Sequence, residues 1–265
     1  MLRNVLLKTL QDRRRALLWW GIGLVGLALY TTLFYPTIRD NPEFSDIFEQ
    51  APEFMKAIVG DISDLTSPEG YLNAELFSLM MPLLFMIFTI GMGSGAIAGE
   101  EERGTLDLLL SNPLPRSKVA LEKFVAMIGA TLVLAFIFWL GLVVGTIAAE
   151  MEIGLGRLVE MTLSSVLLGL AFGTLALTLG CITGKRGLSI GVASTLGVAT
   201  YFLNSLATLV ETLEPFRKLS PFYYYSSAEP LKNGLNPGHV AVLIGLTVVL
   251  LAVALIAFER RDLAV

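Results

Sequence analysis

The chain is 265 residues long, 54% of its residues are hydrophobic, only 16% are charged, and its mean hydropathy is +0.70. Soluble domains are about one quarter charged, so this composition excludes an ordinary soluble protein and predicts an all-α integral membrane protein. The formal net charge is -4, and a single cysteine, Cys181, excludes a disulfide within the chain. We expect one transmembrane domain over residues 1–265, without a cleavable signal peptide.

The N-terminal residues 1–15 have the pattern of a basic amphipathic helix. Leu2, Val5, Leu6 and Leu10 recur at helical spacing, and basic residues occupy other positions. Such a helix lies in the headgroup layer of a bilayer, which predicts an interfacial helix ahead of the first span. The alternative is that these residues extend the first span into the cytoplasm.

Six apolar runs are long enough to cross a bilayer as helices, which requires about 20 mostly apolar residues. Pro82 interrupts the second run and predicts a kink there, which neighbouring helices can accommodate. The runs cover about 16–35, 74–98, 121–149, 158–183, 188–210 and 239–258.

Lysines and arginines concentrate in alternate connecting segments. The N-terminal segment, the 99–118 segment, the 184–187 turn and the C-terminal tail are basic, whereas residues 36–73 carry two basic residues against eight acidic ones. Cytoplasmic loops of membrane proteins are enriched in Lys and Arg. The bias therefore predicts a cell-membrane protein with both termini and the 99–118 segment in the cytoplasm, and with residues 36–73 and 211–237 outside it.

The 211–237 segment contains Pro215, Pro221, Pro230 and the aromatic run Phe222–Tyr225. Tyrosines beside a span usually form a belt at the membrane interface, which is the expectation for this run. A role in gating a substrate path is the alternative.

The 99–118 segment is a charged, proline-terminated stretch between the second and third apolar runs. It begins with Glu100, Glu101 and Glu102, and Leu106, Leu109 and Leu110 then follow at the spacing of a short apolar helical stripe. Asn112, Pro113 and Pro115 end that helix, and Arg116 and Lys118 follow. A helix this short is marginal alone, so we expect the membrane surface or a partner protein to hold it. An ordinary amphipathic loop is the alternative.

This stretch carries a family resemblance. The residues from Glu101 to Arg116, followed by Lys123, resemble the signature of ABC-2 type transporter permeases: an acidic residue, Gly-Thr-Leu, a leucine-rich turn, Ser and Pro, and a basic residue before the third span. The resemblance implies a type V exporter fold, in which residues 104–111 form a cytoplasmic coupling helix that docks on an ATPase subunit. It also implies two permease subunits, identical or different, paired with two ATPase subunits.

The same resemblance implies which residues contact the ATPase subunit. Charged residues would contact the partner or the lipid headgroups, and leucines would fill the docking groove. The implied contact residues are Glu102, Arg103, Gly104, Thr105, Leu106, Leu109, Leu110, Pro113 and Arg116.

Glycines recur every four residues just ahead of this segment, at Gly91, Gly95 and Gly99. Such spacing lets helix backbones approach closely. We expect this face to pack at a seam between permease subunits and to let the helix slide or rotate; packing within one subunit is the alternative.

Several chemical functions are not indicated by the sequence. It lacks the glycine-rich loop followed by Gly-Lys-Ser/Thr that cradles nucleotide phosphates, so ATP and Mg²⁺ are expected on a partner chain. His239 is the only histidine, which is too few for a metalloprotease site. We expect no enzymatic activity, no bound cofactor or metal, and no nucleic-acid partner.

The middles of the six runs are nearly free of charged residues. Ion-coupled carriers usually place ionisable groups in the middle of the membrane, so this pattern favours an ATP-driven exporter and an apolar or amphipathic substrate. An ion-coupled secondary transporter and a membrane scaffold or signalling subunit remain the alternatives.

Overall fold

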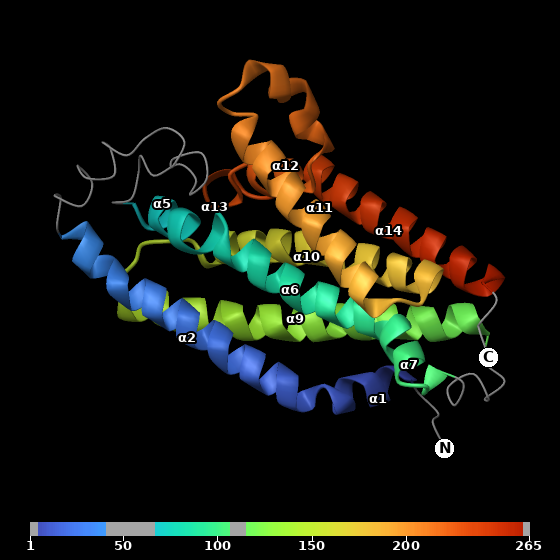
Figure 1. The fold of residues 1–265 in the computed structure, drawn as a ribbon. Coiled ribbons are helices and arrows are strands. Elements are labelled where there is room, and N and C mark those ends of the chain that lie inside the picture. The colour runs from blue at the N-terminus through green and yellow to red at the C-terminus, as the bar shows by residue number, and fades with distance from the viewer. Residues whose placement is uncertain (1–4, 41–66, 107–114, 262–265) are drawn as a thin grey trace.

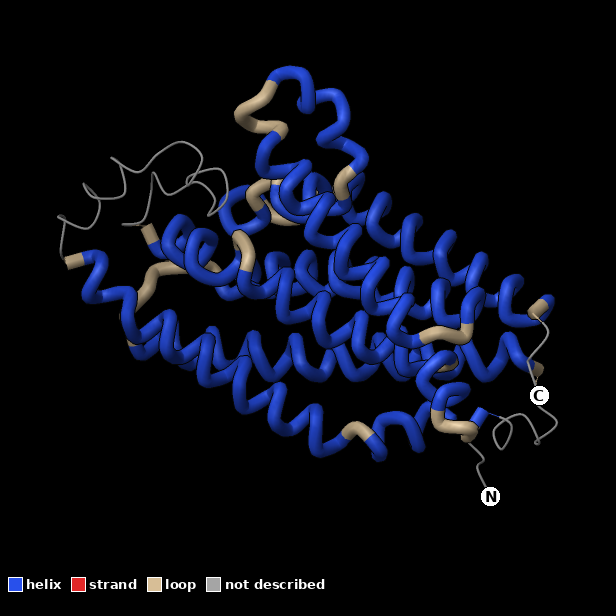
Figure 2. Tube along the Cα trace, viewed as in Figure 1, coloured by secondary structure: helices blue, strands red, loops and turns tan. Residues whose placement is uncertain are grey.

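The structure is a computed structural model that describes residues 5–40, 67–106 and 115–261. Within these ranges all regular structure is helical, as the sequence predicts (Figure 2). Six helical stretches are long and apolar enough to cross a membrane, which confirms the expected fold class. They are α2 (Arg14–Arg39), the stretch Pro68–Ala96, α9 (Arg116–Ala148), α10 (Leu155–Thr183), α11 (Arg186–Leu206) and α14 (Pro237–Arg260).

Short helices flank these spans. α1 (Val5–Asp12) forms where the sequence predicts the interfacial helix, and it is separated from α2 by a turn at Arg13. Its position in the headgroup layer stays a prediction. The others are α7 (Ala98–Glu102), the 3-10 helix η2 (Glu211–Leu219), α12 (Pro221–Ser226) and α13 (Pro230–Asn233).

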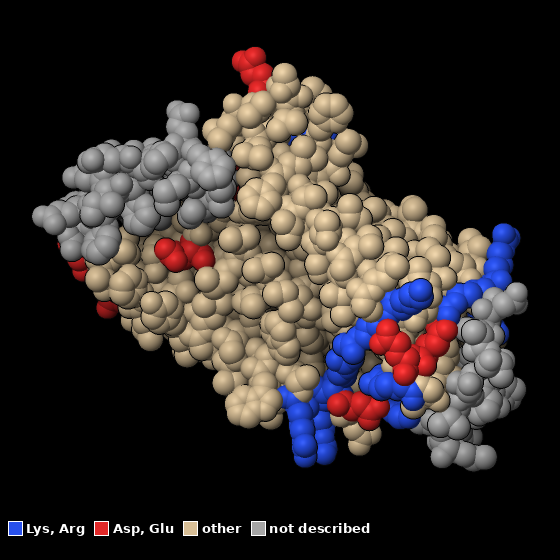
Figure 3. All heavy atoms as spheres, viewed as in Figure 1, with Lys and Arg blue, Asp and Glu red and all other residues tan. Residues whose placement is uncertain are grey.

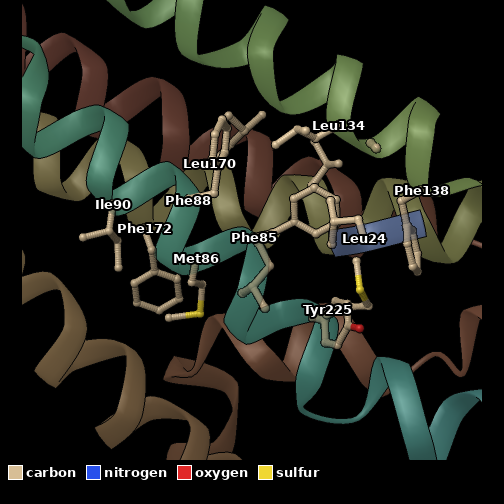
Figure 4. Close-up of a cluster of buried hydrophobic side chains, with 14 of the residues drawn as sticks. Leu24, Phe85, Met86, Phe88, Ile90, Leu134, Phe138, Leu170, Phe172 and Tyr225 are labelled. Atoms are coloured by element: carbon tan, nitrogen blue, oxygen red, sulfur yellow. The ribbon is translucent and has the colours of Figure 1, made fainter. Parts of the chain in front are cut away.

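Helix α10 is the centre of the bundle and packs against α6 (Met80–Ala96), α9, α11 and α14 (Figure 1). In its most apolar stretch 72% of the residues are buried, against 11% in α14 and 22% in α11. Aromatic and aliphatic side chains, among them Phe85, Leu134, Phe138 and Phe172, fill the space between these helices (Figure 4). The apolar faces of α11 and α14 are therefore left for lipid or another subunit.

The second span is built from three helical parts. These are α5 (Pro68–Leu72), a π-helical turn η1 (Asn73–Phe77) and α6, and the backbone leaves helical geometry at Leu79. The sequence predicts a kink at Pro82, and the structure has the break three residues earlier, at Leu79, so Pro82 does not interrupt α6 from inside. It lies in the first turn of α6, where a missing N–H costs no intrahelical hydrogen bond.

The expected interfacial tyrosine belt is wrong for Tyr225. Its side chain is 1% exposed and lies among the residues of the core (Figure 4). Its hydroxyl donates to the carbonyl of Phe77 at 2.6 Å, and it also lies 3.2 Å from the hydroxyl of Ser165 on α10. The tyrosine thus satisfies a carbonyl next to the break at Leu79, and a polar group inside the bundle needs such a partner.

One end of the bundle holds α1, α7, the start of α9 and the C-terminal end of α14 (Figure 1). We call it the α7 end. Helix α9 has 33 residues and is therefore about 50 Å long, which exceeds a hydrocarbon core of about 30 Å. Its first turns are free to extend past the apolar layer and to meet α7.

Candidate functional site

Charged side chains gather at the α7 end, whereas the middle of the bundle on the same face is uncharged (Figure 3). The centre of this cluster is α7, whose three consecutive glutamates each contact a different part of the chain. Glu100 accepts from Lys123 of α9 at 2.8 Å, Glu101 pairs with Arg261 just past α14, and Glu102 accepts from the backbone N–H of Arg186 at the start of α11 at 2.9 Å. The start of the 99–118 segment is thus joined to three membrane-spanning helices.

Glu100 has the most partners of the three. Besides Lys123, Arg103 lies 3.5 Å away and the Thr105 hydroxyl donates to the second carboxylate oxygen. Burial alone would raise the pKa of Glu100, but the hydrogen bonds from Lys123 and Thr105 outweigh it and hold the pKa below its usual value. Glu100 is therefore charged at neutral pH and fixes the first residues after α7.

Arg261 links the C-terminal end of the described chain to α7 and α10. Besides its ion pair with Glu101, it donates to the carbonyls of Gly180 and Cys181 at 3.3 and 3.2 Å. These are carbonyls in the last turn of α10, where a cation is favourable. Gly184 ends α10 with φ +67°, and a side chain there would collide with both Arg261 and Glu101.

The residues implied as ATPase contacts fall into two groups. Leu109, Leu110 and Pro113 lie outside the described residues, and their role in docking stays a prediction.

The others are placed around α7. Arg103 and Gly104 are exposed, Gly104 adopts φ +66°, and Leu106 is 3% exposed. Arg116 donates to the backbone carbonyl of Arg261 at 2.6 Å. Glu102 and Arg116 therefore already have partners within the chain, which the sequence did not indicate.

The glycine ladder has three different environments. A Cβ at Gly91 would meet no described atom within 4 Å. At Gly95 it would lie 3.0 Å from the guanidinium of Arg13, and at Gly99 it would lie 3.4 Å from Cδ of Arg186. Within the described chain, two of the glycines thus make room for arginine side chains rather than for a helix backbone.

A close helix–helix approach involves glycines outside this ladder. A Cβ at Gly93 would overlap the carbonyl oxygen of Gly173, and the Thr89 hydroxyl donates to the carbonyl of Gly169 at 2.6 Å. These contacts hold α6 against α10. The four-residue spacing of Gly169 and Gly173 in the sequence is a signal for this contact, whereas nothing marks Gly93 as their partner.

Metal binding is not indicated at this end of the bundle or elsewhere in the described ranges. Residues 5–40, 67–106 and 115–261 contain no group of three His, Cys, Asp or Glu side chains placed to hold a metal ion. The arrangement offers charged contacts and helix connections rather than reactive groups.

Comparison with known proteins gives one family and two curated relatives. A family model described as "ABC-2 family transporter protein" matches residues 3–263. A protein of Stutzerimonas stutzeri described as "Probable ABC transporter permease protein NosY" is 36% identical over 135 residues, which cover 49% of this chain and 46% of that protein. Its namesake in Pseudomonas aeruginosa is 34% identical over 174 residues, covering 63% of this chain and 62% of that protein. The matches thus span less than two thirds of either relative.

Proposed function

This chain belongs to the ABC-2 family of transporter proteins, and we propose that it is the membrane-spanning permease subunit of an ABC exporter. In this proposal the chain forms the translocation path and catalyses no reaction. Separate ATPase subunits bind ATP and Mg²⁺ and supply the energy. Two relatives that are described as probable ABC transporter permease proteins support it.

The observation that carries the proposal is the set of contacts made by Glu100, Glu101 and Glu102. They join the start of the 99–118 segment to α9, to the end of α14 and to the start of α11. A force applied to this segment by an ATPase subunit would therefore reach several membrane-spanning helices at once. A loop without such connections would absorb the same displacement locally.

The proposed assembly has two permease subunits, identical or different, and two ATPase subunits. Both termini and the 99–118 segment would face the cytoplasm of a cell membrane. Gly91 supports a role of the glycine ladder at the subunit seam, because its Cα faces space that no described residue of this chain fills. Gly95 and Gly99 would act there through the arginines that cover them.

An apolar or amphipathic substrate fits the surface of the chain best. Charged side chains gather at the ends of the bundle on the face in view (Figure 3), and α11 and α14 expose large apolar side chains such as Val198 and Val249. A strongly charged substrate would need polar groups along its path to replace its hydration.

Copurification tests the central claim. The tagged chain, expressed with its neighbouring genes, should copurify with a soluble ATPase in equal amounts. If the chain purifies alone and still transports under an ion gradient, it is a secondary carrier and the proposal is wrong.

A substitution in the docking helix tests the coupling. Leu109→Asp should uncouple ATP hydrolysis from transport without preventing membrane insertion, because it places a charge in an apolar groove. Leu219→Asp is the matched control, since Leu219 is 73% exposed on η2, outside the spanning helices. Normal coupling in Leu109→Asp would refute the docking assignment.

A further inference from the structure

A cavity of about 150 Å³ lies at the α7 end, between α1, α6, α7 and α9. Three cationic side chains line it, Arg13, Arg103 and Lys123, together with the carboxylates Asp12 and Glu100. Its volume is roughly ten times the amount needed to hold one water molecule. The space can therefore hold a polyatomic ion.

Among the side chains that line this cavity, the three cationic ones outnumber the two carboxylates. Lys123 is used in the ion pair with Glu100, and Arg103 also faces that carboxylate. No hydrogen bond or ion pair links the Arg13 guanidinium to any residue that the structure describes. Glu100 is thus shared between Lys123 and Arg103. Arg13 is near the charges of Glu100 and Asp12 but makes no direct ion pair with either.

Arg186 adds a further positive charge beside the cavity. Its side chain lies over Gly99, and its Nε is buried with no hydrogen-bond partner among the described residues. The pKa of Arg13 is lowered first by burial and then by the nearby charges of Arg186 and Arg103. Arg13 and Arg186 are both half-buried, and like charges held together in such a place are costly unless an anion neutralises them.

The position of the cavity indicates which anion is at hand. It lies beside the short helix α1, at the end of six membrane-spanning helices, where lipid headgroups are expected. Basic pockets between helices at this level bind anionic headgroups, and the planar guanidinium of Arg matches phosphate in a bidentate manner.

We propose that Arg13 and Arg103 bind the phosphate of an anionic phospholipid in this cavity. Gly95 keeps the wall flat so that the Arg13 guanidinium can lie against α6. The bound lipid would hold α1 against α7 and so brace the start of the 99–118 segment. The inference does not depend on the transporter assignment, because lipid binding can be measured on this chain alone.

The test uses the full chain purified in a neutral detergent, with lipid binding followed by native mass spectrometry. Phosphatidylglycerol should bind roughly tenfold more tightly than phosphatidylcholine, as expected for charge-assisted hydrogen bonds. Arg13→Gln with Arg103→Gln should remove this preference. Arg14→Gln with Arg15→Gln is the matched control, because it removes the same charge from exposed positions outside the cavity. If both double variants lose the preference for phosphatidylglycerol to the same extent, the proposal is overturned.

A second variant keeps every charge. Gly95→Ala adds a methyl group 3.0 Å from the Arg13 guanidinium and should weaken phosphatidylglycerol binding severalfold, with unchanged helix content by circular dichroism. The proposal is overturned if Gly95→Ala binds phosphatidylglycerol as the native chain does and Arg13→Gln loses binding only together with helix content. That combination would show that Arg13 has a structural role.

Inorganic phosphate distinguishes the source of the anion. If inorganic phosphate displaces phosphatidylglycerol only at millimolar concentration or above, the site binds a lipid headgroup. If inorganic phosphate binds as tightly as phosphatidylglycerol, the site takes free phosphate and the lipid assignment is wrong. If the Arg13 and Arg103 variants keep lipid binding but lose a copurifying protein, the cluster is a protein contact instead.

Discussion

Lys123 of α9 donates a hydrogen bond to Glu100 of α7 across 2.8 Å, and its side chain is only 8% exposed. The pair joins the start of the 99–118 segment to the third span at a depth where solvent screens it little. An ion pair at this depth depends on both partners being present, because each charge alone would be left without compensation.

Lys123→Met should therefore destabilise the protein by roughly 3 kcal/mol, since it leaves Glu100 partly buried with weaker partners. Thermal unfolding in detergent, followed by circular dichroism, measures the change. Lys118→Met is the control, because Lys118 is on the same helix and exposed. Adding Glu100→Gln to Lys123→Met should recover part of the loss, and a purely additive double variant would show that the two residues are not coupled.

The lowered pKa of Glu100 predicts that the stability of the folded chain depends on pH. The pKa of Glu100 is lower in the folded chain than its ordinary value, so its contribution to stability is present above the unfolded value of about 4.3. The contribution is lost as the pH falls through the lowered folded pKa. The unfolding temperature should fall more steeply below about pH 4 in the native chain than in Glu100→Gln. Parallel curves for the two proteins would contradict this assignment.

Tyr225→Phe should destabilise the bundle by about 1–3 kcal/mol, because it leaves the buried carbonyl of Phe77 without its hydrogen bond. The same unfolding measurement applies. Tyr224→Phe is the matched control, since the neighbouring Tyr224 is only half-buried and faces His239 at the edge of the bundle. A larger effect in Tyr224→Phe than in Tyr225→Phe would argue against this role of the hydroxyl.

The spans themselves could be predicted, because a bilayer imposes a length and a composition on each crossing helix. The residue pairs could not. Glu101 meets Arg261, which lies 160 residues later in the chain, and no periodicity links them. Arg13 illustrates the same limit. The sequence counts it as one of several basic residues that set orientation, and only the fold places it against Gly95.

The glycines show why a local sequence pattern does not by itself predict which residues lie at a helix–helix contact. The ladder of Gly91, Gly95 and Gly99 is the more regular pattern, yet it is Gly93 that lies directly against the backbone of α10. The face of α6 that meets α10 depends on the rotation of that helix. The π-helical turn and the break at Leu79 come just before α6 and change the helical phase, so the sequence period does not indicate that rotation.

Gly93→Ala tests this packing directly. The new methyl group would overlap the carbonyl oxygen of Gly173 and approach the backbone of Leu177, so α6 and α10 would have to move apart. We expect a loss of at least about 2 kcal/mol, in the range of overpacked cores. Gly91→Ala adds the same methyl group two residues away, where it meets no described atom, and should change stability by less than about 1 kcal/mol. Equal unfolding temperatures for the two variants would show that this close approach does not hold the bundle together.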